Sequence, residues 1–427
     1  MINLYNQKPV NIYDASYDQM FEKLQGNILK GHGRNFTSHI FIEFEEGKRA
    51  ELKEWLKTFA NEKITSCKKQ LKENIAFKQS GISGETFFGF YISSSGYSYL
   101  EEKVESDFLG RMKNAKIDDL SPKKWEPGFQ NDIHAMLLIA DDSLASLKDT
   151  ETFICEELEH FATIRKIENG NVLKNSEGAG IEHFGYADGV SQPLFFSDEI
   201  EELEAKYKIP GIEFKPFFPL SQVLVQDPFC KDGDAFGSYL VFRKLEQDVK
   251  GFKQKEAEIA TKLNWENAEK EEVGAYIVGR FEDGTPHVLS KTDGIIDNLT
   301  NNFNYDNSPI GRCPFLNHIR ATNERNEDSK EMIMARRGIP YGIFSGDKGN
   351  AGLLFMSFQS NIKKQFEATQ IRANDNNDLI IGQKLPKEIS LSCFDEENEN
   401  KVSVKSFVKL KGGEYFFAPS IPYLKNM

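Results

Sequence analysis

Apolar residues recur with two different periods along the first 160 residues. Residues 48–59 place Leu52, Trp55, Leu56 and Phe59 at helical spacing, whereas other segments are apolar or alternating over the length of one strand. The predicted elements are, in order, a strand at 39–44, a helix at 48–59, a strand at 86–93, a short helix near 97–104, a strand at 133–140 and a helix that runs towards 161. This part of the chain therefore predicts a strand–helix unit that is then repeated.

The same succession returns in the second half of the chain. It predicts a strand at 238–242, an amphipathic helix at 247–265, a turn at 283–285, a strand at 352–358 and a helix at 361–369. Asn169-Gly170 predicts a hairpin turn, and the prolines of residues 194–230 predict a linker. We therefore expect two similar α+β domains, residues 1–205 and 206–427, each an antiparallel sheet with helices on one face.

Composition and charge narrow the classes of protein. The 427 residues include 39% hydrophobic residues and carry a formal net charge of -13, which predicts a globular protein that repels nucleic acid and anionic membranes. No stretch approaches the roughly 20 apolar residues that span a bilayer. The five cysteines show no C-x-x-C spacing, and the N-terminus shows no basic start followed by an apolar run. We expect reduced thiols and a cytoplasmic location.

Residues 311–326 combine one histidine, His318, with several arginines. A neutral imidazole is a good axial ligand for haem iron, and nearby cations suit the two haem carboxylates. A lone histidine is more often a structural or surface residue, so this segment alone does not decide between the two.

Three other segments carry candidate chemistry. Asp188 lies between Gly185 and Gly189, which permit close approach to a ligand, although such glycines more often form a plain turn. Glu182, His183 and Asp188 are alternative metal ligands. The adjacent arginines Arg336 and Arg337 predict either an anion site or a structural ion pair, and Asp378 is a cap or turn candidate.

Taken together, these residues resemble the dye-decolourising peroxidase family, a family of haem enzymes. Gly185-Tyr186-Ala187-Asp188-Gly189 matches the family's GxxDG motif, and residues 313–325 look like its proximal haem segment. Further similar blocks lie at 25–34, 237–252, 277–289, 336–342 and 352–366. The resemblance is strongest to the longer, fungal-type branch. It implies two ferredoxin-like domains, with haem between sheet and helices mainly in the C-terminal half.

The resemblance also implies roles for individual residues. His318 aligns with the proximal iron ligand, Asp378 with the carboxylate on its far nitrogen, and Arg325 with an arginine that pairs with a haem propionate. Asp188 and Arg336 align with the distal, peroxide-binding pair. The implied activity is reduction of hydrogen peroxide to water by haem b, through a ferryl haem with a porphyrin radical, with oxidation of organic, dye-like or phenolic reductants. A homo-oligomer is left open.

Several alternatives stay open at this point. Cys313 as a thiolate ligand would give an oxygen-activating haem enzyme. A haem-binding or haem-iron-handling protein would need His318 but no proton shuttle, and a duplicated ferredoxin-like binding module would need no haem. Relatives oxidise bulky dyes at surface tryptophan or tyrosine radicals, for which Tyr341 is a better candidate here than Trp55, Trp125 or Trp265.

Overall fold

One ten-stranded antiparallel sheet forms the centre of the protein. The computed structural model describes residues 2–104, 108–207, 217–265, 268–294, 301, 303–305, 317–344, 350–376, 378, 380–382, 387–395 and 398–427. The strands of this sheet are β1 (Phe36–Phe44), β2 (Phe87–Ser93), β3 (Ala135–Asp141), β4 (Ala162–Asn171), β7 (Val225–Gln226), β8 (Phe236–Gln247), β9 (Ala335–Arg336), β10 (Ile339–Gly342), β11 (Ala351–Gln359) and β14 (Val408–Ala418). Their order is β10-β11-β8-β14-β2-β3-β1-β4, with β7 beside β8 and β9 beside β11.

The two halves of the chain have the same topology. In the N-terminal half, α2 (Arg49–Glu62) follows β1 and α6 (Leu144–Leu158) precedes β4, and the strand order is β2-β3-β1-β4. In the C-terminal half, α8 (Val249–Leu263) follows β8 and α12 (Ala368–Asp375) precedes β14, in the matching order β10-β11-β8-β14. Each half is thus a ferredoxin-like unit, which confirms the predicted α+β fold.

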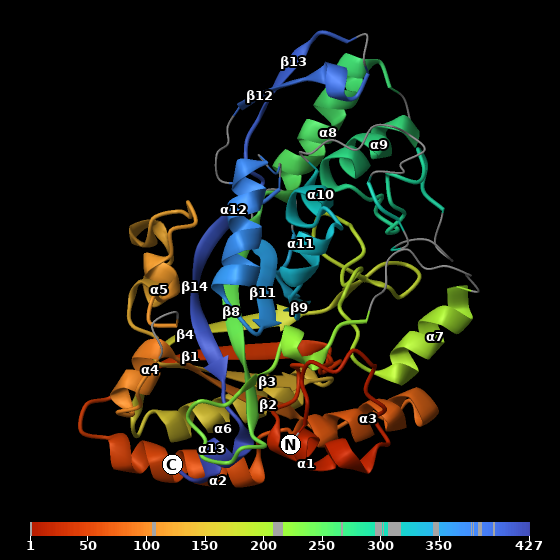
Figure 1. The fold of residues 1–427 in the computed structure, drawn as a ribbon. Coiled ribbons are helices and arrows are strands. Elements are labelled where there is room, and N and C mark those ends of the chain that lie inside the picture. Colours follow the sequence, from red (N-terminus) through yellow and green to blue (C-terminus); the bar gives the residue numbers. More distant parts are fainter. Residues whose placement is uncertain are drawn as a thin grey trace.

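Figure 1 shows how the helices lie about the sheet. Helices α1 (Asp18–Lys23), α2, α3 (Cys67–Ser80) and α6 lie below the sheet in this view, and α8, α9 (Ala268–Val278), α10 (His318–Thr322) and α12 lie above it. The amphipathic pattern of α2 accounts for its position, because Leu52, Leu56 and Phe59 are buried. The remaining elements are η1 (Ala15–Tyr17), α4 (Ser94–Tyr99), η2 (Met112–Asn114), η3 (Pro122–Lys124), α5 (Pro127–Gln130), β5 (Leu173–Lys174), β6 (Gly180–Ile181), α7 (Ser197–Tyr207), η4 (Leu220–Gln222), α11 (Glu327–Glu331), a π-helical turn (Lys363–Glu367), β12 (Lys387–Ser390), η6 (Leu391–Cys393), β13 (Lys401–Val404) and α13 (Ile421–Lys425).

The two halves share one sheet because β14 pairs with β2. The C-terminal helix α13 also packs against α2, so the end of the chain lies among N-terminal elements (Figure 1). The outermost strands, β10 and β4, contact each other, so the sheet curls almost into a closed barrel. The domain boundary at residue 205 stays a prediction.

The hairpin predicted at Asn169-Gly170 is wrong. Both residues lie within the continuous strand β4, where they pair with Ser38 and Thr37 of β1. Gly170 serves close packing instead of a turn, because a Cβ at this position would collide with the side chain of Ile339 on β10. This glycine therefore permits the contact that closes the sheet.

The predicted linker at 194–230 also needs correction. Helix α7 and strand β7 lie within it, while residues 208–216 are outside the described residues. The acidic residues Asp198 and Glu199 in the first turn of α7 favour a helix at this position. Helix α3 and strand β14 were not predicted.

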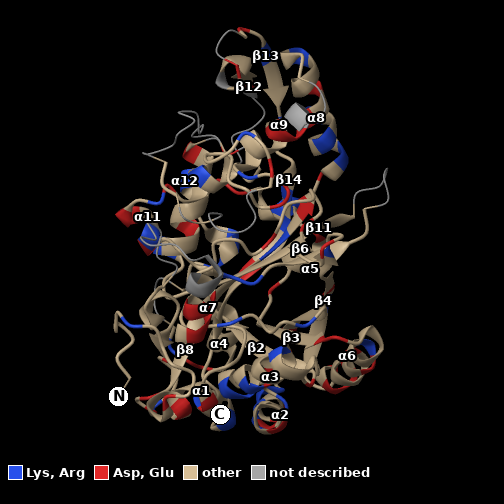
Figure 2. Ribbon diagram, turned by 90° about the vertical axis from the view of Figure 1, so that its right-hand side faces the viewer, with Lys and Arg blue, Asp and Glu red and all other residues tan. Residues whose placement is uncertain are grey.

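The charges on the surface form no single-sign face in the view of Figure 2. Basic and acidic residues are interspersed on the helices, as on α6 and α11. Within the described parts of the chain, none of the helices combines the length and apolar character needed to cross a membrane.

Candidate functional site

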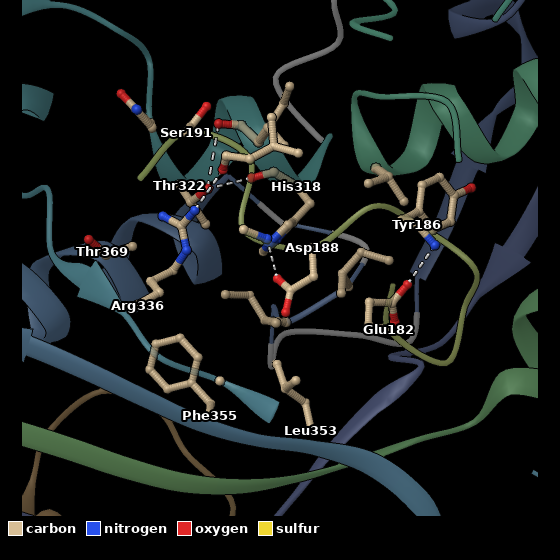
Figure 3. A pocket seen from close by; sticks show the side chains of 18 of the residues that line it. Glu182, Tyr186, Asp188, Ser191, His318, Thr322, Arg336, Leu353, Phe355 and Thr369 are labelled. Atoms are coloured by element: carbon tan, nitrogen blue, oxygen red, sulfur yellow. Dashed lines mark hydrogen bonds between the residues drawn. The ribbon is translucent and has the colours of Figure 1, made fainter. Parts of the chain in front are cut away.

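A cavity of about 330 Å³ lies between the segment 182–191 and the C-terminal half of the chain. Its lining includes four of the five residues singled out by the sequence: Asp188, His318, Arg325 and Arg336. They come from separate elements, and Figure 3 shows Asp188, His318 and Arg336 around the same space. The fifth residue, Asp378, lies directly behind His318.

His318 begins the short helix α10. The helix starts here because the Asn317 side chain caps it, accepting a hydrogen bond from Arg320 N at 2.9 Å. His318 Nδ1 lies 2.7 Å from Asp378 Oδ2, so the carboxylate accepts the proton on this nitrogen. This bond engages Nδ1, so Nε2 is the ring nitrogen available to a ligand in the cavity.

Asp378 is completely buried behind this ring. It follows α12, and its Oδ1 accepts hydrogen bonds from Ile380 N at 2.7 Å and Ile381 N at 3.3 Å. These two donors stabilise the ionised carboxylate and fix its position. A buried carboxylate held in this way sets the orientation of His318 and makes its imidazole more electron-rich.

Asp188 lies on an irregular segment whose turns are made by glycines. Gly185 and Gly189 have φ values of +106° and +75°, which favour glycine. Asp188 Oδ1 accepts a hydrogen bond from Gly189 N at 2.7 Å, and Asp188 N donates to Gly180 O at 3.0 Å. The carboxylate is otherwise exposed to the cavity.

Arg336 lies at the end of β9, beside the same segment. Its Nη2 donates to Val190 O at 2.9 Å, and its backbone N donates to Gln192 Oε1 at 3.0 Å. Burial lowers the pKa of Arg336, and the charge of Asp188 acts in the opposite direction. A cation and a carboxylate are thus brought together at one side of the cavity.

Two further arginines gather at another part of the wall. Arg325, with a φ of +61°, lies 3.7 Å above the Phe303 ring and donates to Asn301 O at 2.7 Å. Arg280 donates to Gly284 O at 2.9 Å. Burial, followed by the charge of Arg325, lowers the pKa of Arg280 to about 9. Burial of a guanidinium cation costs free energy, and an anion beside Arg280 and Arg325 would offset this cost.

The sequence did not single out Arg280, although it lies within one of the blocks that carry the resemblance. The same holds for Leu353 and Phe355, which line the cavity from β11. Alternation along a strand places both side chains on one face of the sheet, and this is the one signal that pairs them. Ile319, Ile380, Ile381 and Val408 also belong to the apolar part of the lining.

These residues fit a haem group. The cavity offers one imidazole nitrogen fixed by a buried carboxylate, apolar walls for a flat macrocycle, and buried guanidinium groups for two carboxylates. A carboxylate and a third guanidinium, those of Asp188 and Arg336, border the same space. This combination defines the site of a haem-dependent oxidoreductase more closely than that of a hydrolase or a plain binding module.

The alternative metal site at Glu182, His183 and Asp188 is not supported. Glu182 accepts hydrogen bonds from Phe184 N at 2.9 Å and Tyr186 N at 3.0 Å, while His183 Nε2 lies 2.8 Å from Tyr341 O. Within the described ranges, no three His, Cys, Asp or Glu side chains are placed to hold a metal ion.

The interpretation of Tyr341 as a surface radical site is wrong. This side chain on β10 is only 5% exposed, with Lys244 Nζ 4.9 Å from its ring centre. Trp125 is buried too, whereas Trp55 and Trp265 are partly buried. The competing ligand Cys313 lies outside the described residues; Cys67, Cys155 and Cys230 are free thiols.

Comparison with known proteins agrees with this geometry. A family model described as Dyp-type peroxidase, C-terminal, matches residues 220–384. The multifunctional dye peroxidase DyP2 of Amycolatopsis sp. is 35% identical, covering 96% of this chain and 96% of the relative. The crystal structure of a DyP-type peroxidase from Anabaena sp. is 37% identical, with a TM-score of 0.91 over 99% of this chain and 98% of that chain.

The chain therefore belongs to the Dyp-type peroxidase family. It is an oxidoreductase of the haem peroxidase class, with the two-domain ferredoxin-like fold of that family. Fungal proteins match as well: the dye-decolorizing peroxidase msp1 of Mycetinis scorodonius is 28% identical over 95% of this chain and 86% of its own length. Of these three relatives, the two bacterial ones are the more similar.

Proposed function

We propose that this protein uses haem b to reduce hydrogen peroxide with electrons taken from organic, dye-like or phenolic molecules. The observation that carries the proposal is the arrangement around one cavity: a histidine fixed by a buried carboxylate, and a separate carboxylate–guanidinium pair. A protein that only binds haem needs the first feature and has no use for the second.

His318 would hold the iron through Nε2. Because Asp378 accepts the Nδ1 proton at 2.7 Å, the imidazole cannot turn away from the cavity, and it donates more electron density through Nε2. Arg325 and Arg280 would bind the haem carboxylates. Both guanidinium groups have pKa values lowered by burial, so an anionic partner is strongly favoured there.

When bound, haem would supply the redox chemistry for the two-electron reduction of peroxide, with the electrons replaced one at a time by two organic donor molecules. Asp188 would take the proton from the incoming peroxide on its free carboxylate oxygen and return it to the departing oxygen, which leaves as water. Arg336 would stabilise the negative charge that develops as the O–O bond breaks, since a fixed buried cation is strongly effective there.

Two neighbouring features support this division of labour. Leu353 and Phe355 present apolar surface to the cavity, which limits competing water. Ala187, beside Asp188, is small, and so leaves space next to the carboxylate for entry of peroxide. The cytoplasmic location and any homo-oligomer remain predictions from the sequence.

The main competing function is haem-iron handling without peroxidase turnover. The stoichiometry of the reaction separates the two. We expect the haem-loaded protein to oxidise two molecules of 2,6-dimethoxyphenol for each peroxide consumed, with haem content unchanged. Loss of iron from the haem without phenol oxidation would contradict the proposal, as would release of oxygen from peroxide without phenol oxidation.

A further inference from the structure

Arg336 and Asp188 border the same cavity, but Arg336 lies on a strand and Asp188 lies on an irregular segment. Arg336 belongs to the central sheet, where β9 pairs with β11. Asp188 lies on the segment 182–192, which contains no helix or strand of its own. Asp188 would transfer a proton and Arg336 would stabilise charge on the same small molecule. These roles require a fixed distance and orientation between the two side chains. Something other than regular secondary structure must therefore hold Asp188 opposite Arg336.

Two side chains connect the ends of this segment to β9 and β10, while Glu182 accepts a hydrogen bond from Gln247 on β8. At its start, His183 Nε2 lies 2.8 Å from Tyr341 O on β10. At its end, Gln192 Oε1 accepts a hydrogen bond from Arg336 N at 3.0 Å. Both partner atoms are main-chain atoms of the β9–β10 region, which also presents the Arg336 guanidinium. The segment forms an arch over this region, with Asp188 between the two fixed ends.

Arg336 also holds the middle of the arch to β9, because its Nη2 donates a hydrogen bond to Val190 O at 2.9 Å. Within the arch, Glu182 accepts hydrogen bonds from Phe184 N and Tyr186 N, so its first turn is internally rigid. The main chain beside Asp188 has two further bonds, from Ala187 N to Glu282 O at 2.9 Å and from Asp188 N to Gly180 O at 3.0 Å. These lead away from β9 and β10, so the bonds of His183 and Gln192 are the ones that fix both ends of the segment relative to the strands beside Arg336.

We propose that His183 and Gln192 are positioning residues for the peroxide reaction, which set the placement of Asp188 relative to Arg336 by anchoring both ends of this arch. The inference rests on the proposed function of Asp188 and Arg336. Neither His183 nor Gln192 lines the cavity or touches the reacting atoms. Each acts through a single hydrogen bond to main chain, so a side chain that keeps this bond should replace it.

The test uses one disruptive and one conservative variant at each position. His183→Leu and Gln192→Leu remove the ties, whereas His183→Gln keeps a donor for Tyr341 O and Gln192→Glu keeps an acceptor for Arg336 N. Asn175→Ala is the matched control. Asn175 Oδ1 accepts hydrogen bonds from Glu177 N and Ala179 N in the preceding turn, with no contact to β9 or β10 among its hydrogen bonds.

The first readout is amide hydrogen exchange in residues 182–192 of the haem-free protein, which does not depend on turnover. We expect faster exchange in both leucine variants and wild-type exchange in Asn175→Ala. The second readout is the rate constant of the haem-loaded protein with peroxide in stopped flow. Because Asp188 would be misplaced in the leucine variants, we expect their rate constant with peroxide to fall by roughly 10- to 100-fold. The conservative variants should react at near wild-type rates.

Unchanged amide exchange or unchanged peroxide rate constants in the leucine variants would contradict the positioning role of His183 and Gln192. Equal losses in leucine and conservative variants would do so too, because they would indicate a purely structural requirement for the native side chains. Arg336→Leu, measured in parallel, distinguishes failure of the proposed peroxidase function from failure of the positioning role of His183 and Gln192. A wild-type rate in that variant would mean failure of the proposed function, whereas a slow rate there beside fast leucine variants would mean failure of the arch alone.

Discussion

His318 Nδ1 lies 2.7 Å from Asp378 Oδ2, although the two residues are 60 positions apart in the chain. The pair joins the first residue of α10 to the loop that follows α12. Because Asp378 also accepts two backbone N–H groups, its position does not depend on the histidine. This relationship gives the cavity an oriented nitrogen ligand.

Removal of that ligand should separate haem binding from folding. We expect His318→Ala to keep the thermal unfolding of the haem-free protein within a few degrees, because His318 is only half-buried at 31% side-chain exposure. Its haem content after reconstitution should fall, or its Soret band should show a changed ligand. A variant with the wild-type spectrum would assign the ligand to another residue.

Asp378→Asn should alter the electronic character of the site without emptying it. The single amide oxygen can accept from His318 Nδ1 or from Ile380 N, but not from both, and the negative charge is lost, so the imidazole becomes less electron-rich. We expect haem to remain bound and the reduction potential of its iron to rise. An unchanged potential, measured by redox titration, would show that Asp378 has no electrostatic influence on the ligand.

The arginine pair predicts selectivity for the haem carboxylates. Because burial lowers the pKa of both Arg280 and Arg325, the pair should bind haem more tightly than haem dimethyl ester, by about 10-fold or more. Arg325→Gln should shrink this difference. Equal affinity of the wild-type protein for both haems, from absorbance titration, would contradict the assignment.

Acid should destabilise the fold through its buried histidines. Burial lowers the pKa of His39 to about 4 from its ordinary 6.5, so the folded state keeps this ring neutral. This stabilising contribution is complete above pH 6.5 and is lost as the pH falls towards 4; a shift of this size corresponds to about 3 kcal/mol. His39→Phe should therefore lose less stability than wild type between pH 7 and pH 4.

The check is urea unfolding at both pH values, with His160→Phe as the control. His160 is exposed, in contrast to His39, which is 1% exposed. We expect the control to follow the wild type. The same acid sensitivity in His39→Phe as in the wild type would remove His39 as the cause.

Much of the fold was predictable because its pattern is local. The apolar run of β1 reflects a strand buried on both faces, and the helical spacing of α2 reflects burial on one side. The repetition of such segments indicated two similar units. Asn169-Gly170 misled because a long-range contact with Ile339 requires the glycine, and no local pattern shows that contact. Strand β14 was missed although its pairings with β8 and β2 join the two halves.

The site was predictable only where a motif names the residue. Asp188, His318 and Arg336 stood out as candidates in their segments and received definite roles from the family resemblance, and the structure brings them to one cavity. Arg280 and Gln192 carry no such signal, because their roles depend on the distance to another element. A side chain such as Gln192, whose contact is with the backbone of Arg336, is visible only in three dimensions.

The proposed function requires Asp188 and Arg336 to act together on peroxide beside a haem held by His318. It is tested most directly by mixing haem-loaded wild type and Arg336→Leu with one equivalent of hydrogen peroxide in a stopped-flow spectrometer. We expect a rapid change of the Soret band in the wild type and a change slower by roughly 100-fold or more in the variant, with equal haem content. Equal rates in the two proteins would contradict it.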